Sequence, residues 1–351
     1  MIFKVEKINL TSDQWANRIE NSPVSDIYLT PQYVYATRLI SKGEPYIASL
    51  MQDDNNFVYY PFYLQEISLQ HSSSTQLYDI VSPYGYSGPL INGDSNLASQ
   101  FFDKFSQWCK ENHVITEFIR YNPFLKNHSP AHASTTVELR NKIIYVKLNR
   151  PIEEIKNGFC SQHKRNLKKA IKGGLTFSEI DAEKHLDEFI QMYYHTMEKV
   201  DAKTLYFFSK EYFDTLYAVL KEHFHLFAVY HDDNIIAMAI CLSLKDKIHY
   251  HLGASRQDHL TMRPNNLLFP EIMRWSQEHG FGLFNLGGGL SMDDPLFQFK
   301  NGFSKTEGEF YCGKTIFNPE VYDQLNELKR QEKGLSSEEF YSSTFFPLYN
   351  T

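Results

Sequence analysis

Cysteine is scarce in this sequence, and its arrangement argues against two common ways of stabilising a fold. The four cysteines are widely separated and form no Cys-x-x-Cys pair: Cys109, Cys160, Cys241 and Cys312. This spacing disfavours both a structural zinc site and a disulfide framework. Two His-x-His pairs occur, but no third ligand follows at a suggestive spacing, so we expect no metal site.

Long apolar runs are also lacking. No stretch approaches the ~20 apolar residues that a membrane-spanning helix needs. The first residues, MIFKVEKINL, have no apolar run behind a basic segment and do not resemble a signal peptide. These absences predict a cytoplasmic protein without a transmembrane segment, and they are compatible with peripheral contact with a membrane.

Basic residues are not in excess. Lysine and arginine number 35 against 42 acidic residues, which gives a net charge of −7 at neutral pH. A dedicated nucleic-acid-binding protein is usually basic overall, so we expect no DNA partner, and any RNA contact must come from a local patch. The 351 residues, 42% of them hydrophobic and 22% charged, are instead typical of a globular protein with about two domains.

Hydrophobic periodicity divides the chain into two halves with the same order of elements: a strand, two helices, a three-strand meander, a helix and a strand. In the first half we expect these elements at 4–10, 13–21, 31–40, 45–51, 57–67, 77–81, 96–112 and 114–121. In the second half we expect them at 175–180, 183–200, 209–223, 225–230, 235–244, 248–255, 264–279 and 282–286. The pattern predicts an α+β protein with two tandem copies of one unit, each a mixed central sheet flanked by helices.

The repeat also sets the expected domain boundaries. Residues 1–150 form the first domain and residues 151–318 the second, with a helical connection near 149–159. Residues 319–351 form a polar helix and a tail that ends in Phe-Phe-Pro-Leu-Tyr-Asn. Because this apolar end would be unfavourable in water, we expect the tail to dock on the body of the protein.

Four short segments stand out along the chain. They are the stretch 82–89 (SPYGYSGP), the basic stretch 162–172 (QHKRNLKKAIK), the Asn-Leu-Gly-Gly-Gly and Phe-Lys-x-x-Phe sequences within 285–303, and the terminal Phe-Phe-Pro-Leu-Tyr. Together they resemble the Fem-type peptidyltransferases of the GNAT N-acyltransferase superfamily. The resemblance implies two tandem GNAT-like domains, the first for the acceptor and the second for catalysis and the donor. It implies transfer of an acyl or aminoacyl group to an amine of a cell-envelope precursor, such as a peptidoglycan stem peptide or an amino sugar.

The sequence departs from this family in two places. Acyl-CoA enzymes of the superfamily carry a glycine-rich loop whose N–H groups hold the pyrophosphate at a helix N-terminus. The corresponding loop here, 256–266 (RQDHLTMRPNN), contains no glycine, which disfavours tight binding of acyl-CoA. The coiled-coil arm of some Fem enzymes is absent as well, because no heptad run occurs. The co-substrate is therefore left open between acyl-CoA and aminoacyl-tRNA, and no tightly bound cofactor is expected.

Three residues of the second half are candidates for catalysis. Acyl transfer to an amine needs positive charge or N–H groups beside the developing oxyanion. By resemblance, Lys300 lies in the active cleft and stabilises this charge. Asn285 ends a strand before three glycines, where the backbone can approach the donor closely. Tyr250 is on the preceding strand, and simple alternation places Tyr250 and Leu252 on one face.

Two further groups are predicted to bind substrates. The expected donor and phosphate ligands are cations and glycines: Lys164, Arg165, Lys168, Lys169, Arg256, Arg263, Gly287 and Gly288. The first four share the basic face of one helix, and the two arginines flank the N-terminus of the helix that begins at Pro264. The expected acceptor ligands are Tyr84, Gly85, Tyr86 and Asp79. Tyr84 and Tyr86 are suited to stacking on a sugar or base, and Asp79 to acting as a base.

Alternative functions are compatible with the same residues. The partner of the enzyme is expected to be a small-molecule or lipid-linked amine, together with tRNA if the donor is aminoacyl-tRNA. The main alternative is a non-catalytic GNAT-fold protein that binds a ligand or regulates a partner, because fold alone does not imply activity. A third hypothesis is an RNA-binding protein that uses the basic face of 162–172, with steeply salt-dependent affinity.

Overall fold

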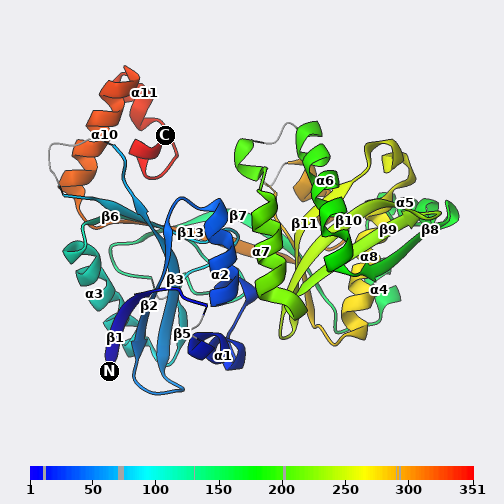
Figure 1. The fold of residues 1–351 in the computed structure, drawn as a ribbon, viewed down its shortest axis with the longest axis horizontal. Helices are drawn as coiled ribbons and strands as arrows, with labels where there is room; N and C mark the ends of the chain where they lie inside the picture. Colours follow the sequence, from blue (N-terminus) through cyan, green and yellow to red (C-terminus); the bar gives the residue numbers. More distant parts are fainter. Residues whose placement is uncertain (11–12, 70–74, 130, 201–202, 290, 292–293) are drawn as a thin grey trace. The chain divides into compact units, whose positions relative to one another are not determined.

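The computed structural model describes residues 1–10, 13–69, 75–129, 131–200, 203–289, 291 and 294–351. The chain divides into two compact units (Figure 1). Unit 1 contains Met1–Arg140 and Phe310–Thr351, and unit 2 contains Asn141–Glu309. Unit 1 is thus discontinuous in sequence, whereas the sequence pattern suggests boundaries at 150 and 318 and a separate C-terminal segment.

Unit 1 contains a mixed sheet with helices on its faces. Its strands are β1 (Ile2–Lys7), β2 (Glu44–Met51), β3 (Phe57–Glu66), β4 (Tyr78–Val81), β5 (Leu90–Asn92), β6 (Val114–Arg120) and the later part of β13 (Glu307–Ile316). Its helices are α1 (Asp13–Asn21), α2 (Pro31–Thr37), α3 (Ser95–Glu111), α10 (Pro319–Lys333) and α11 (Ser337–Tyr341). Strands β1 to β4 are antiparallel neighbours, β4 is parallel to β6, and β6 is antiparallel to β13. The short β5 pairs with β3.

Unit 2 repeats this pairing scheme. Its strands are the later part of β7 (Thr136–Lys147), then β8 (Leu175–Ile180), β9 (Phe224–His231), β10 (Asn234–Leu244), β11 (Lys247–Ser255) and β12 (Leu283–Gly287). Its helices are α4 (Ile152–Asn157), α5 (Ser161–Lys172), α6 (Ala182–Lys199), α7 (Lys210–Leu220), α8 (Pro264–Glu278) and α9 (Pro295–Asn301). Strands β8 to β11 are antiparallel neighbours, β11 is parallel to β12, and β12 is antiparallel to β7.

The strands β7 and β13 are absent from the expected element order. Each follows the last element of one repeat, and the first half of β7 is polar and exposed, so it gives no strand signal. Cys312–Ile316 of β13 pairs with β6 in unit 1, and Ile144–Lys147 of β7 pairs with β12 in unit 2. The last strand of the unit 1 sheet therefore comes from chain that follows unit 2, which explains why the sequence boundaries differ from those of the structure.

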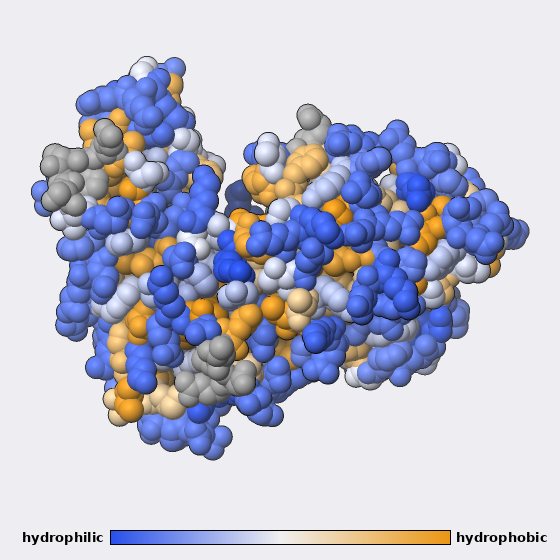
Figure 2. Space-filling model, in the orientation of Figure 1, coloured by the Kyte–Doolittle hydropathy of each residue, from blue (hydrophilic) through white to orange (hydrophobic). Residues whose placement is uncertain are grey.

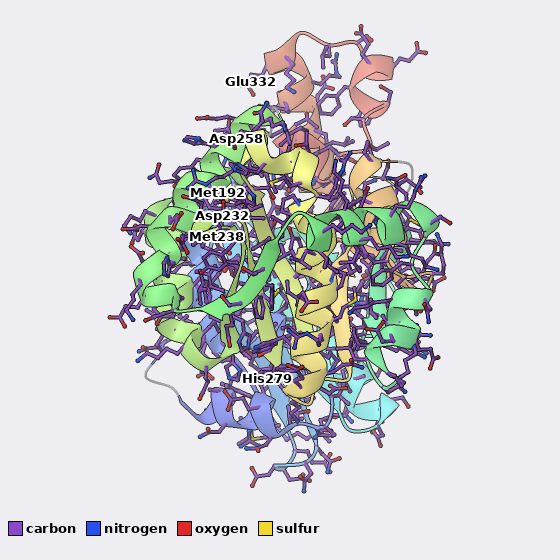
Figure 3. All side chains as sticks on the ribbon, turned by 90° about the vertical axis from the view of Figure 1, so that its right-hand side faces the viewer. Met192, Asp232, Met238, Asp258, His279 and Glu332 are labelled. Carbon is purple, nitrogen blue, oxygen red and sulfur yellow. The ribbon has the colours of Figure 1, made fainter. Side chains whose placement is uncertain are left out.

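Helices cover both faces of the sheet in unit 2. Helix α8 lies in front of the strands in Figure 3, where His279, the residue that follows it, is labelled near its lower end. Buried residues of α5 and α8, such as Leu167 and Ile272, pack with Cys241 of β10 in one core. Aromatic residues of α6 and α7 pack with one another on the other side. Strand β10 is consequently buried along almost its whole length.

The C-terminal tail docks on unit 1 through a buried carboxylate. Asp79 is only 1% exposed, and it accepts hydrogen bonds from the hydroxyls of Thr116 and Tyr349, both at 2.6 Å, and from the Asn350 amide at 3.2 Å. Burial raises the pKa of Asp79, and these three hydrogen bonds oppose that rise. Phe346 packs on Tyr322 of α10, so apolar contacts accompany the polar ones.

A second buried carboxyl lies in the sheet of unit 1. Glu117 of β6 is 5% exposed and accepts a hydrogen bond of 3.0 Å from the Thr315 hydroxyl of β13. Burial raises the pKa of Glu117 to about 7, because the charged form loses its hydration. The folded state therefore favours the protonated side chain up to neutral pH.

This burial predicts a pH dependence of stability. The folded pKa of Glu117 is about 7 and its ordinary value is 4.5, so unfolding should become easier as pH rises between these values. We expect Glu117→Gln to remove this slope and to raise the free energy of unfolding by about 3 kcal/mol near pH 8. Near pH 4.5 the two proteins should be equally stable. Urea unfolding at both pH values measures the effect, and an unchanged slope in the variant would contradict it.

Candidate active site

The parallel strands β11 and β12 separate near their carboxyl ends. Their pairing extends only from Lys247↔Leu283 to His249↔Asn285. Beyond this point β11 continues beside β10 to Ser255, whereas β12 shifts register against β7 and ends at Gly287. The separation leaves an opening in the hydrogen-bonded sheet, and most of the candidate catalytic residues border it.

A bulge in β11 determines which way Tyr250 points. Ile240 pairs with Leu252, but the adjacent Cys241 pairs with Tyr250, so His251 is an extra residue. Tyr250 and Leu252 consequently lie on opposite faces, and the expectation that they share a face is wrong. Tyr250 faces α8, where its ring packs 4.9 Å from that of Phe269. Simple alternation fails here because it assumes an uninterrupted strand.

Lys300 is buried at the end of β12. It lies on the short helix α9, which Asp294 caps by accepting a 2.7 Å hydrogen bond from the Phe297 N–H. The side chain is 6% exposed, and its Nζ donates a 2.6 Å hydrogen bond to the Gly288 carbonyl. The Nζ is also 5.9 Å from the centroid of the Tyr250 ring. Lys300, Tyr250 and Gly288 are thus brought together in unit 2.

The charge state of Lys300 is set mainly by burial. Burial lowers its pKa from 10.5 to about 8, and the nearby Asp294 carboxylate opposes this effect. At neutral pH most Lys300 side chains are therefore cationic. They lose their charge as the pH rises through about 8. A cation in this position is suited to stabilising an oxyanion.

Asn285 supports the turn that follows β12. Its Oδ1 accepts a 2.8 Å hydrogen bond from the Gly287 N–H, so its Nδ2 is the donor to His249 Nδ1 at 3.1 Å. His249 therefore carries its ring proton on Nε2. Gly287 has φ of 77°, a conformation that favours glycine. Asn285 is 1% exposed, and its amide makes both of these contacts inside the protein.

Four cations of α5 line a pocket on unit 2. The pocket has a volume of about 530 Å³, and its lining residues are Arg165, Lys168, Lys169, Lys172, Gly173 and Met262. Met262 belongs to the segment between β11 and α8, which contains the glycine-free loop 256–266. Figure 2 shows mostly hydrophilic residues at the right-hand end of unit 2, the end at which Figure 1 labels α5. Lys164 shares the helix but is not among the lining residues.

The two predicted arginine ligands lie elsewhere. The guanidinium of Arg256 donates a 2.7 Å hydrogen bond to the Ile235 carbonyl and is 3.3 Å from the Glu188 carboxylate of α6. Arg263 caps α8 in the left-handed conformation with φ of 67°, and its side chain is exposed. The N-terminus of α8 offers little to a phosphate, because Pro264 has no N–H and that of Asn266 bonds to the Arg263 carbonyl.

The predicted acceptor loop of unit 1 is firmly packed. A Cβ on Gly85 would be 2.7 Å from the Tyr28 ring. Tyr86 is 9% exposed and packs between the rings of Tyr28 and Phe310. Tyr84 is half-buried, and its carbonyl accepts a 2.8 Å hydrogen bond from Tyr33. Tyr84 thus has the more accessible of the two tyrosine rings, and Asp79 anchors the tail as described above.

Two residues escape the sequence analysis. Asp294 caps α9, and its position before Pro295 is a recognisable helix start. His163 of α5 packs against α9 near Lys300. No sequence signal points to His163, because its partner Phe299 is far away in the chain.

Within the described parts of the chain, no three histidine, cysteine or acidic residues are grouped so that they could hold a metal ion. No helix there is long and apolar enough to cross a bilayer.

Part of the sequence and the fold of the chain are similar to those of known proteins. Residues 159–301 match the family of the acetyltransferase (GNAT) domain. No curated protein sequence matches the chain at a significant level. The fold is similar to that of FemX, with 14% identity, a TM-score of 0.69, and coverage of 91% of this chain and 99% of that chain.

Two further solved structures have the same fold. L-PGS from Bacillus licheniformis is 12% identical with a TM-score of 0.57, covering 88% of this chain and 93% of that one. The C-terminal domain of a putative lysylphosphatidylglycerol synthetase from Agrobacterium fabrum is 16% identical with a TM-score of 0.53, covering 82% and 88%. Residues 159–301 therefore match the GNAT acetyltransferase domain, and the fold of the chain is similar to that of FemX. These findings confirm the predicted superfamily, the α+β fold class and the enzyme class, an acyltransferase.

The packing of Tyr250 can be tested without a substrate. A Cβ on Gly253 would overlap the Tyr250 hydroxyl, because the ring folds back over this glycine. We expect Gly253→Ala to lower the free energy of unfolding by about 1–3 kcal/mol, the usual effect of overpacking. Adding Tyr250→Phe, which removes the overlapping hydroxyl, should restore part of the loss. Equal stability of the single and double variants in urea would exclude this contact.

Proposed function

We propose that this acyltransferase moves an acyl or aminoacyl group from acyl-CoA or aminoacyl-tRNA to an amine of a cell-envelope precursor. The observation that supports this most directly is the buried ammonium of Lys300 beside the opening between β11 and β12. The substrates we favour, a peptidoglycan stem peptide or an amino sugar, follow from the resemblance to the Fem enzymes.

The reaction requires charge stabilisation more than covalent chemistry by the protein. The acceptor nitrogen attacks the donor carbonyl carbon, a C–N bond forms, and the carbonyl oxygen becomes an oxyanion. Lys300 stabilises this oxyanion, while the tyrosine ring of Tyr250 forms one wall beside it. The C–S bond of a thioester or the C–O bond of an ester then breaks, and the proton lost by the amine nitrogen ends on the departing sulfur or oxygen, with solvent as its carrier.

The donor is held by its phosphates at the α5 pocket. Coenzyme A and tRNA both carry phosphates, and four cations line this pocket on a chain of net charge −7. The glycine-free loop and Pro264 leave few N–H groups for the usual pyrophosphate site. In this proposal the cationic side chains of α5 bind the phosphates in place of those N–H groups. The acceptor is an amine on a small or lipid-linked molecule.

The test is a transfer assay on the full chain. Acetyl-CoA or aminoacyl-tRNA is mixed with a nucleotide-linked stem peptide or an amino sugar, and the acylated amine is detected by mass spectrometry. Formation of product from one donor class supports the proposal and identifies the donor. Binding of a ligand without turnover by any pair would favour the non-catalytic alternative.

Removal of the Lys300 ammonium should affect turnover more than binding. We expect Lys300→Ala to lower kcat by roughly 100- to 1,000-fold, the typical effect of losing one oxyanion ligand. Lys300→Arg should retain part of the activity. Wild-type kcat should fall as pH rises through about 8, where Lys300 loses its proton. This alkaline limb should vanish in Lys300→Arg, since arginine stays charged. Identical pH profiles for the two proteins would contradict the assignment.

The α5 pocket has a matched control on its own helix. We expect Arg165→Ala with Lys168→Ala to raise the KM of the donor at least 10-fold and to weaken its salt dependence, because two phosphate contacts are lost. Lys164→Ala removes a charge from the same helix outside the pocket, and should change KM less than 2-fold. Equal effects of the two changes would show a general charge effect in place of a pocket.

A further inference from the structure

Helix α5 is joined to α9, the helix that carries Lys300. The Cys160 N–H, at the start of α5, donates a 2.8 Å hydrogen bond to the Gly302 carbonyl, just after α9. One turn later, the His163 ring bonds to the Phe299 carbonyl at 2.8 Å. The contacts bracket Lys300, since Phe299 precedes it and Gly302 follows α9.

The His163 ring is buried between two aromatic rings and a backbone carbonyl. The ring is 7% exposed and lies 4.9 Å from the Phe299 ring and 4.2 Å from the Phe303 ring. Because a carbonyl can only accept, Nε2 carries the proton and donates it to the Phe299 oxygen. Nδ1 has no hydrogen-bond partner among the described residues. Burial lowers the pKa of His163, the bond to Phe299 opposes this, and nearby Lys305 lowers it further, so the ring stays neutral at neutral pH.

The His163 ring can occupy its position only because residue 302 is glycine. A Cβ at this position would overlap His163 Nε2, the atom that makes the hydrogen bond. The aromatic residues of the Phe-Lys-x-x-Phe segment thus have a second task besides packing the core. Together with Gly302, they form the binding surface for the imidazole ring of His163.

We propose that His163 is a positioning residue for Lys300, which fixes α9 so that the lysine ammonium stays at the end of β12. The proposal rests on the proposed function for its catalytic meaning. The same helix carries the phosphate pocket on Arg165, Lys168, Lys169 and Lys172. A single rigid helix thereby holds the donor phosphates at one end and the oxyanion-stabilising cation, through His163, at the other.

Two substitutions at His163 separate hydrogen bonding from packing. His163→Gln can place an amide N–H where Nε2 lies, whereas His163→Leu keeps apolar bulk and loses the donor. We expect His163→Leu to lower kcat at least 10-fold with the KM of the donor changed less than 2-fold. His163→Gln should stay within about 3-fold of wild type. Gly302→Ala, which displaces the ring from the other side, should resemble His163→Leu. Equal kcat values for the Gln and Leu variants would overturn the proposal.

A readout without turnover keeps this test separate from the proposed function. Selective 15N labelling of lysine, with Lys300→Arg to assign the signal, gives the pKa of Lys300 by NMR titration. In His163→Leu, a loosened α9 should hydrate Lys300 and raise its pKa from about 8 toward the ordinary 10.5, with a smaller rise in His163→Gln. An unchanged Lys300 pKa in folded His163→Leu would overturn the positioning role, whether or not the protein shows transferase activity.

Discussion

The hydrogen bond from the Lys300 ammonium to the Gly288 carbonyl is the contact on which the site depends. It joins α9 to the end of β12, and it keeps a cation where β11 and β12 separate. Burial of this charge is unfavourable unless a polar partner is present, and the carbonyl supplies that partner. The strand separation, the left-handed Gly287 and the cap at Asp294 all serve to bring the two groups together.

Other parts of unit 2 offer groups that could bind the donor, which the Lys300–Gly288 contact does not do by itself. Acyl transfer needs the donor to be held so that its carbonyl reaches the cation. The loop that would usually hold its pyrophosphate has no glycine, and its helix begins with Pro264. The cations of α5 lie against that loop through Met262 and offer a replacement made of side chains. His163 connects the same helix to α9, so the two binding functions share one rigid element.

Much of this fold could be predicted from the sequence, because alternation and helical periodicity report on burial within single elements. The eight elements of each repeat are of this kind. The strands β7 and β13 could not be found, since one half of β7 is polar and both fall outside the repeat. Short motifs point to the candidate site residues but not to their geometry: the bulge at His251 reverses the direction of Tyr250, and no local pattern signals such a bulge. The partners of Asp79 and His163 are distant in sequence, so their roles emerge only in the folded chain.

The most direct test of this account is affinity labelling with an electrophilic donor analogue. Bromoacetyl-CoA, or tRNA with a bromoacetylated 3′ end, carries a reactive carbon where the acyl group would lie. Because the pKa of Lys300 is about 8, part of it is a neutral nucleophile near this pH. The account predicts that one analogue alkylates Lys300, that the natural donor protects against this, and that peptide mass spectrometry locates the label on α9. Donor-protected labelling confined to unit 1, or no protected labelling with either analogue, would contradict it.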